Sequence, residues 1–514
     1  MSGIGQPGGR RDDALMLTRL SRADAVSLHT QTSTTSAHTV ALIVLEASKQ
    51  LSHERLHQLV ASSLPQLARF RSRLVGKPLG MGQLVWDEID DYDPTPQTHC
   101  ATVHAPGGRP EVADLIAQLT ARRQDRGKPL WEAWSIDGLA GGRWALAVKM
   151  APVLSDGGVG AAAMWSRLLT NGPRNSPSDL PAEPSLGSPS LGELGTDAVA
   201  EIVENNVTGV WLIAEAVTGV LQALRRRLCG LDEPDPIPPA ASSMSGPLPR
   251  NAFNAPLTQR RALAFASIPL AQLKDISNAF GGSITNVFLA ACTLSLRSWL
   301  QRHDTVPEDP LLMQMPLSLP AADPATLGNP LAIGQIRLPV QLDDPVQVLT
   351  NLHTATERLN TERFRDAEKS STTVDLASVT PLIPPILVRA GMQLYTRSGL
   401  RQRLGPICHG TVSYISRKPV PAYCAGAKVV GMHTAAALVE GCGLNITLTS
   451  HDDVMDLSVS VCPDNVPSVD EIASGIAESV DILATAARKS PRGQGRSVVT
   501  DMTTHVAKHP HAAR

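Results

Sequence analysis

Aromatic side chains are scarce in this chain, at 3% of its 514 residues, and neither sign of charge is in excess, because the formal net charge is −2. Proteins that bind nucleic acid use aromatic platforms for base stacking and an excess of basic residues for phosphate contacts. The composition therefore argues against a nucleic-acid partner. With 42% hydrophobic residues, it is otherwise typical of an ordinary globular protein.

Paired cysteines are lacking as well. The seven cysteines are scattered, their number is odd, and no two of them have the C-x-x-C spacing. Disulfide frameworks use an even set of cysteines, and most zinc sites use closely spaced pairs. We therefore expect reduced, mostly buried thiols, no metal site and a cytoplasmic location.

Long apolar runs are the third absence. No run approaches the roughly 20 residues that a membrane-spanning helix needs. The polar, glycine-rich N-terminal stretch also has no apolar core of the kind found in signal peptides. The sequence thus predicts a chain without a transmembrane helix, in which any membrane contact is peripheral.

Two stretches rich in proline, serine and glycine divide the chain, at residues 171–196 and 232–250, with a helical pattern at residues 199–228 between them. Such composition is typical of linkers. The flanking parts each mix strand and helix patterns, which favours two α/β lobes. The expected division is a disordered segment at 1–14, an N-terminal lobe at 15–170, linkers and a connecting helix at 171–257, a C-terminal lobe at 258–487 and a disordered tail at 488–514.

The stretch KMAPVLSDGGVG, residues 149–160, follows a clear strand pattern. In residues 143–150 the side chains alternate between the two faces of the predicted strand. The even-numbered residues from Trp144 to Met150 therefore share one face. The sequence then breaks at Asp156-Gly157 into a predicted helix, AAAMWSRLL, with Ser155 or Asp156 as its N-cap.

Other stretches carry equally clear patterns. Residues 38–45 form an apolar, β-branched run that predicts a buried strand, and a helical pattern starts at Ser52. In the second half we expect a strand at 262–270, a helix from Ser283, a hairpin around residues 451–453 and a last helix that begins with a capping box at Ser468.

Several segments, in their order along the chain, resemble the bacterial wax ester synthase/diacylglycerol acyltransferase family. They are Leu20-Ser21-Arg22-Ala23-Asp24-Ala25, Pro129-Leu130-Trp131-Glu132, Gly328-Asn329, Ala425-Gly426-Ala427 and Gly443-Leu444-Asn445-Ile446-Thr447. The resemblance covers residues 15 to 487, approximately. It implies an α/β fold of two lobes like those of CoA-dependent acyltransferases, each a mixed sheet with flanking helices, with a tunnel between them.

Members of this family transfer a fatty acyl group from acyl-CoA to diacylglycerol or a long-chain alcohol, which yields triacylglycerol or a wax ester. The resemblance therefore implies acyl-CoA as co-substrate and no bound cofactor. The family's base is the second histidine of an HHxxxDG motif, which takes the proton of the attacking alcohol. Aligned on Asp156 and Gly157, the two histidines fall on Ala151 and Pro152. Strand alternation places position 152 where a base should project, yet Pro152 has no proton-accepting group.

Other signatures of the family are altered in the same way. Its Asn-Asp pair falls on Thr285 and Asn286, and the arginine that usually closes a VPVSLR-like strand is Pro320. Its SNVPGP-like segment corresponds to residues 413–418. We expect Asp156 to be structural, as the N-cap of a helix.

Another histidine could replace the missing base, and His38 is the best-motivated stand-in, because the family's opening segment has a counterpart there. The other histidines in the folded part are His29, His99, His104, His353, His409 and His433. Lys149 is nearer in sequence, but we expect it to be solvated or salt-bridged.

Two functions remain open at this point. The first is an acyl-CoA-dependent O-acyltransferase with weakened activity. The alternative is a noncatalytic relative that binds acyl-CoA or lipid, or that partners an active paralogue. In both cases we expect a cytoplasmic protein, with peripheral contact at the inner membrane or lipid droplets.

Overall fold

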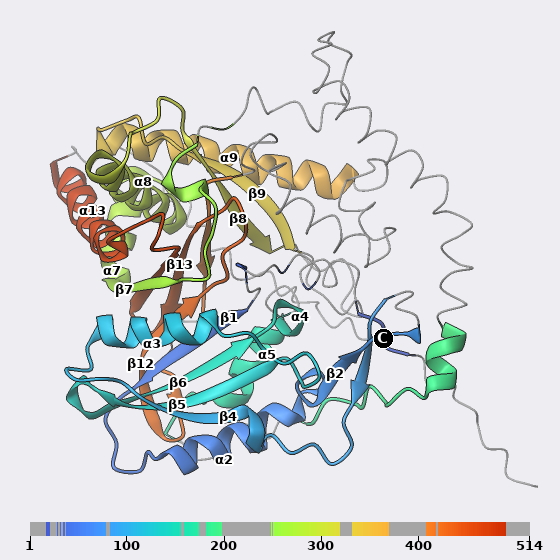
Figure 1. Ribbon diagram of the computed structural model, residues 1–514. Helices are drawn as coiled ribbons and strands as arrows, with labels where there is room; N and C mark the ends of the chain where they lie inside the picture. The colour runs from blue at the N-terminus through green and yellow to red at the C-terminus, as the bar shows by residue number, and fades with distance from the viewer. Residues whose placement is uncertain are drawn as a thin grey trace, which may run out of the picture.

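The structure, a computed structural model, describes residues 17–20, 28, 31, 34–35, 38–78, 83–155, 159–173, 181–197, 248, 250–318, 331–369, 408–417 and 420–489. Asp156, Gly157, Pro320, the Gly328-Asn329 pair and the helical pattern at residues 199–228 lie outside these ranges. So do residues 1–14, 21–25 and 490–514. Two mixed sheets with flanking helices form two lobes (Figure 1), which confirms the expected fold class; the tunnel between the lobes stays a prediction.

The first sheet has six strands in the order β11-β12-β1-β6-β5-β4. Its neighbours are antiparallel, except that β4 and β5 run parallel. A separate hairpin, β2–β3, lies beside this sheet in the same lobe (Figure 1). The strands are β1 (Thr39–Leu45), β2 (Ser72–Val75), β3 (Val85–Glu88), β4 (Thr98–Thr102), β5 (Trp131–Leu139), β6 (Arg143–Met150), β11 (Tyr423–Cys424) and β12 (Ala427–Ala435).

Because the side chains of β6 alternate as expected, they pack into two separate hydrophobic clusters, one on each face of the sheet. Leu146, Val148 and Met150 pack with helices α2 (His53–Ser63) and α5 (Val159–Leu168). Ala145 and Ala147, on the other face, pack with helix α3 (Arg109–Ala121). The side chain of Ser52 accepts a hydrogen bond from the backbone N–H of Arg55, which confirms where the expected helix begins.

The second sheet also has six strands, in the order β7-β14-β13-β10-β8-β9, and β8, β10 and β13 run parallel. The strands are β7 (Ala262–Pro269), β8 (Leu311–Ser318), β9 (Leu331–Leu338), β10 (Gly410–Ile415), β13 (Leu444–His451) and β14 (Val454–Val461). The helices are α7 (Leu270–Phe280), α8 (Ile284–His303), α9 (Pro345–Lys369) and α13 (Val469–Lys489). Short 3-10 helices lie at Leu64–Gln66, Ala68–Arg71, Thr95–Gln97, Ala140–Gly142 and Ala252–Asn254.

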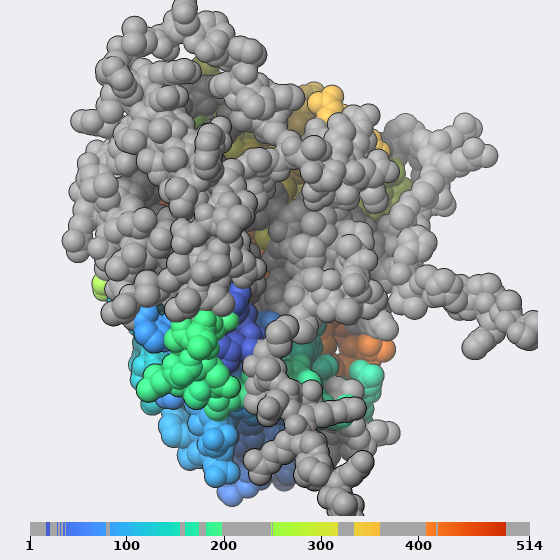
Figure 2. All heavy atoms as spheres, turned by 90° about the vertical axis from the view of Figure 1, so that its right-hand side faces the viewer, coloured from blue at the N-terminus to red at the C-terminus, as the bar shows by residue number. Residues whose placement is uncertain are grey.

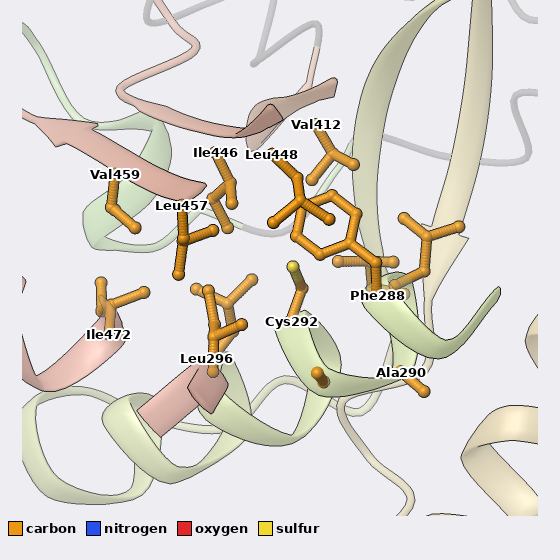
Figure 3. Close-up of a cluster of buried hydrophobic side chains, with 14 of the residues drawn as sticks. Phe288, Ala290, Cys292, Leu296, Val412, Ile446, Leu448, Leu457, Val459 and Ile472 are labelled. Carbon is orange, nitrogen blue, oxygen red and sulfur yellow. The ribbon is translucent and has the colours of Figure 1, made fainter. Parts of the chain in front are cut away.

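One face of the second sheet is apolar and is covered by these helices. Phe288, Cys292 and Leu296 of α8 point toward the side chains of β13 and β14 (Figure 3). The opposite face is polar and yet buried, since Asn445, Thr447 and Ser458 are each at most 6% exposed. Burial of hydroxyl and amide groups requires hydrogen-bond partners, and the neighbouring lobe supplies some of them.

Strand β12 connects the two lobes. It comes from the second half of the sequence but pairs with β1 in the first sheet, with Leu42 opposite His433. Residues 423–435, which were expected in the C-terminal lobe, thus complete the N-terminal sheet. From this position the backbone N–H of Met432 donates to Asp456 of β14 at 2.6 Å, and that of Thr434 donates to the Ser458 hydroxyl at 3.1 Å.

Part of the expected linker is bound to the first lobe. Asp197 forms ion pairs with Arg19 at 2.7 Å and with Lys77 at 2.6 Å. The backbone N–H of Leu186 donates to Glu88 of β3 at 2.7 Å. Figure 2 shows the resulting green segment, residues 181–197, on the surface of this lobe.

Within the described ranges, no single helix has both the length and the apolar character needed to cross a membrane. The helices α7 and α8 meet the criterion only as a pair, bent by 99° at the break between them. Both contribute side chains to the core of the second lobe.

Candidate active site

The corner at which the chain leaves β6, residues 151–154, carries no proton-accepting side chain. Ala151 is fully buried, and its backbone N–H donates to the carbonyl of Leu130 at 3.0 Å. Pro152 is half-buried and begins a short helix, α4 (Pro152–Ser155). The strand therefore ends at Met150, and the expectation that alternation continues to position 152 is corrected.

The expected N-cap is corrected in part. Ser155 belongs to α4, and α5 begins only at Val159, so Ser155 is not the residue that starts the second helix. Asp156 and Gly157 lie outside the described residues.

His38 lies at this corner. Thr39 is the first residue of β1 and pairs with Met150, the last residue of β6. His38 precedes Thr39 in the chain, and Ala151 follows Met150. The best-motivated stand-in from the sequence thus lies at the end of the ladder where the altered motif begins.

The imidazole of His38 is buried, with 4% exposed. Its Nδ1 has no hydrogen-bond partner in the part of the chain that the structure describes. Burial lowers the pKa of His38 to about 3, and the nearby charges of Lys149, Arg126 and Arg123 act in the same direction. The ring is therefore neutral at physiological pH, and it offers an unpaired buried nitrogen.

The remaining candidate histidines have other surroundings. His409 is fully buried, and its Nδ1 accepts from the backbone N–H of Leu312 at 3.0 Å. His433 lies on β12 with its ring against that of Phe265, and burial lowers its pKa. His99 lies on β4, and His104 is exposed after that strand. His29 lies outside the described residues.

Lys149 is neither solvated nor on the surface, which corrects the expectation for this residue. Its side chain is fully buried, and its Nζ donates to the carbonyl of Leu119 at 2.9 Å and to the carbonyl of Arg122. These carbonyls end helix α3, where a cation is favoured because the last carbonyls lack partners within the helix. Burial lowers the pKa of Lys149 to about 8, although the opposite charge of Glu132 on β5 raises it.

At the positions of the family's Asn-Asp pair, a side chain of α8 is hydrogen-bonded to α9. Asn286, at the start of α8, is 2% exposed. Its Nδ2 lies 2.9 Å from His353 Nδ1, and its Oδ1 accepts from the Thr356 hydroxyl at 2.8 Å, with both partners on α9. Thr285 is half-buried beside it. The side chain of Asn286 thus has hydrogen-bond partners on a neighbouring helix.

The segment that replaces the SNVPGP-like signature is anchored to β13. The hydroxyl groups of Ser413 and Thr447 lie 2.9 Å apart, and the backbone N–H of Arg417 donates to Ser450 at 2.7 Å. Burial lowers the pKa of Arg417. These contacts fix residues 413–417 along the sheet, and the last residue of the segment, Lys418, lies outside the described ranges.

A buried carboxylate at the lobe junction was not expected from the sequence. Asp456 is 1% exposed; it accepts from the hydroxyl of Ser267 at 2.6 Å, and His451 Nδ1 lies 3.1 Å from its Oδ2. Burial raises its pKa, but the hydrogen bonds and the nearby imidazoles outweigh this effect and lower the pKa on balance. The signal was available, because Asp456 interrupts an otherwise apolar and hydroxyl-bearing strand.

Two family profiles match the chain. The wax ester synthase/diacylglycerol acyltransferase catalytic domain matches residues 20–288, and the WS/DGAT C-terminal domain matches residues 327–484. Two Mycobacterium tuberculosis proteins, both named as candidate diacylglycerol O-acyltransferases, align over nearly their whole length. One is 27% identical, over 92% of this chain and 98% of its own. The other is 24% identical, over 93% and 92%.

Solved structures show the same fold. A wax ester synthase/diacylglycerol acyltransferase from Marinobacter aquaeolei matches with a TM-score of 0.63 and 21% identity, over 92% of this chain and all of the other. The first condensation domain of the calcium-dependent antibiotic synthetase matches with a TM-score of 0.52 and 16% identity, over 93% and 98%.

Proposed function

Because this chain belongs to the wax ester synthase/diacylglycerol acyltransferase family, we propose that it is an acyl-CoA-dependent O-acyltransferase. The acceptor is diacylglycerol or a long-chain alcohol, and the product is triacylglycerol or a wax ester. Acyl-CoA is a co-substrate in this proposal, and the chemistry uses no resident cofactor. The names of the mycobacterial relatives support the choice of acceptor.

The observation that carries the proposal is the position of His38. An alcohol is a weak nucleophile at neutral pH, so transfer needs a group that takes its proton as it attacks. Ala151 and Pro152 cannot do so. His38 lies at the end of the β1–β6 ladder where the altered motif begins, it is neutral, and its Nδ1 is unpaired among the described residues.

The steps follow from this placement. The acceptor hydroxyl gives its proton to His38 while its oxygen attacks the thioester carbonyl carbon. The tetrahedral intermediate collapses with cleavage of the carbon–sulfur bond, and the imidazolium returns the proton to the CoA thiolate. The ester and CoA then leave, and His38 is again neutral.

The pKa of His38, about 3, makes it a weak base. General-base catalysis contributes about 10²–10⁴-fold and is most effective when the pKa lies near the working pH. We therefore expect slow turnover, with orientation of the two substrates as a separate contribution.

A second function is favoured by the loss of both motif histidines. In that case the chain binds acyl-CoA or lipid without transfer, or partners an active paralogue. For either function we propose a cytoplasmic protein with peripheral contact at the inner membrane or lipid droplets.

The test is an assay of purified protein with labelled acyl-CoA and diacylglycerol, in which binding and product are scored separately. Wild-type protein should form product above a heat-killed sample, and His38→Gln should abolish product while acyl-CoA binding persists. The matched control is His104→Gln, because His104 is exposed and should leave product formation unchanged. Binding without product in the wild type would establish the second function instead.

A further inference from the structure

Two buried cysteines lie at the amino ends of neighbouring strands in the second lobe. Cys408 precedes β10 and Cys442 precedes β13, and they are 1% and 6% exposed. The strands are parallel, with Thr411 opposite Asn445. Each cysteine lies three residues before its member of this pair, so both lie just beyond the same end of the parallel ladder.

The two strands approach closely at this end. A Cβ atom added to Gly410 would lie 2.7 Å from the carbonyl oxygen of Leu444 and 3.0 Å from its Cβ. Neighbouring strands are about 4.7–4.9 Å apart, and disulfide bonds join cysteines whose Cα atoms lie about 4.4–6.8 Å apart. The spacing therefore suits a disulfide without a large movement of the backbone.

The two cysteines influence each other's titration. Interaction with Cys442 raises the pKa of the Cys408 thiol, and burial raises it further. Interaction with Cys408 lowers the pKa of Cys442 despite its burial. The Thr411 hydroxyl, 3.6 Å from Cys442 Sγ, acts in the same direction. Cys442 is thus the nucleophilic thiol of the pair, since the thiolate is the reactive form.

We propose that Cys408 and Cys442 are an oxidisable pair that closes a disulfide bond between the amino ends of β10 and β13 when the protein meets a peroxide. The Cys442 thiolate attacks hydrogen peroxide, so that a sulfur–oxygen bond forms, the oxygen–oxygen bond breaks, and hydroxide leaves and is protonated to water. The Cys408 thiol then attacks the sulfur of the sulfenic acid, and a sulfur–sulfur bond forms. The hydroxyl group of the sulfenic acid leaves with the proton of Cys408 as a second water. Two thiols are oxidised, and one peroxide is reduced to two waters.

The other described thiols have different surroundings. Cys292 lies inside the core beneath the sheet, where burial raises its pKa well above the ordinary value. Burial also raises the pKa of Cys424, to about 12. Cys100 is exposed, so it can react with reagents in solution but lies on β4, in the other lobe. Cys462 is also buried, and its Sγ lies 3.4 Å from the Thr258 hydroxyl. Among the described thiols the disulfide is therefore expected at one pair, and it does not depend on the proposed acyl transfer.

The test is peptide mapping of the full-length protein after treatment with hydrogen peroxide, in a Cys100→Ser background that removes the one exposed thiol among the described residues. Remaining thiols are alkylated before digestion. The expected result is one cross-linked species that joins the peptides of Cys408 and Cys442, with the loss of two alkylation sites. Dithiothreitol should restore both sites.

Variants separate this pairing from general oxidation. Cys408→Ala should leave Cys442 uncross-linked and detectable as a sulfenic acid with dimedone, and Cys442→Ala should leave Cys408 reduced. The matched control, Cys424→Ala, should keep the cross-link, because Cys424 is equally buried but lies in β11 of the first sheet. Independent alkylation of Cys408 and Cys442 in the peroxide-treated parent protein would overturn the proposal, and this readout does not depend on whether any cysteine variant folds.

Discussion

His38 immediately precedes β1, Lys149 lies near the end of the neighbouring strand β6, and the ammonium group of Lys149 contributes to the low pKa of the His38 imidazole, after burial itself. Lys149 is held in place by the carbonyls that end α3. The end of a helix thus fixes a charge that adds to the effect of burial and helps to keep the imidazole beside the altered motif neutral. The first prediction concerns this pair.

Lys149→Met should raise the pKa of His38 above its value of about 3, because the methionine removes a nearby positive charge but leaves the ring buried. The carbonyls of Leu119 and Arg122 also lose their donor, which should lower the free energy of unfolding by about 1–3 kcal/mol. NMR titration of the His38 ring and denaturant unfolding measure the two effects. Lys274→Met, at an exposed position on α7, is the control; an unchanged His38 titration in Lys149→Met would contradict the prediction.

The low pKa of His38 should make the protein sensitive to acid. The pKa is lowered from 6.5 to about 3, so between these values the unfolded state binds more protons than the native state. Stability should therefore fall as the pH is lowered through this window, with at most about 1.4 kcal/mol per pH unit from this group. Urea unfolding of the wild type and of His38→Gln from neutral pH down into this window measures the difference, and the variant should show the shallower dependence. Equal slopes for the two proteins would show that His38 takes up its proton without unfolding.

Restoration of the motif should increase acyl transfer. Ala151→His together with Pro152→His supplies imidazoles at the family's positions, and we expect a gain of about 10²-fold or more in product formation. The measurement is the labelled acyl-CoA assay at equal concentrations of folded protein. Lys128→His adds a histidine at an exposed site and should give no gain. A double variant that binds acyl-CoA but transfers no faster than the wild type would show that more than the base has been lost.

Asp456 should be central to the contact between the lobes. Asp456→Ala removes the acceptor for Met432 N–H and for Ser267, and it leaves His451 without its carboxylate. Loss of one partner from such a buried polar cluster costs about 3–5 kcal/mol. Ser458→Ala, which removes only the acceptor of Thr434 N–H, should cost about 1 kcal/mol. Denaturant unfolding and the exchange rate of the Met432 amide measure both changes; similar losses in the two variants would refute the ranking.

Much of the fold could be predicted because local patterns decide it. The alternation in residues 143–150 predicted β6 with its two faces, and the pattern around residues 451–453 predicted the β13–β14 hairpin. Ser52, Ser283 and Ser468 precede α2, α8 and α13, where serine side chains or the local backbone satisfy the first N–H groups.

Long-range pairing could not be predicted in the same way. On one side β12 pairs with β11, its neighbour in sequence, but nothing local to β12 indicates that its other side pairs with β1. The burial of Lys149 depends on the carbonyl of Arg122, the residue that follows α3, which is 27 residues away from it. At the candidate site, the position of His38 beside the end of β6 follows from the register of β1 and β6, which a single sequence does not specify across a separation of this length.

The path of β12 has a consequence for how the protein is made. The first sheet includes residues from Thr39 to Ala435, so the N-terminal lobe cannot acquire all its strands until most of the chain has left the ribosome. Until then β1 is an open edge, and unpaired edges favour association between chains. The first sheet is therefore completed late in synthesis, after residues on both sides of the C-terminal lobe's first strands have been made.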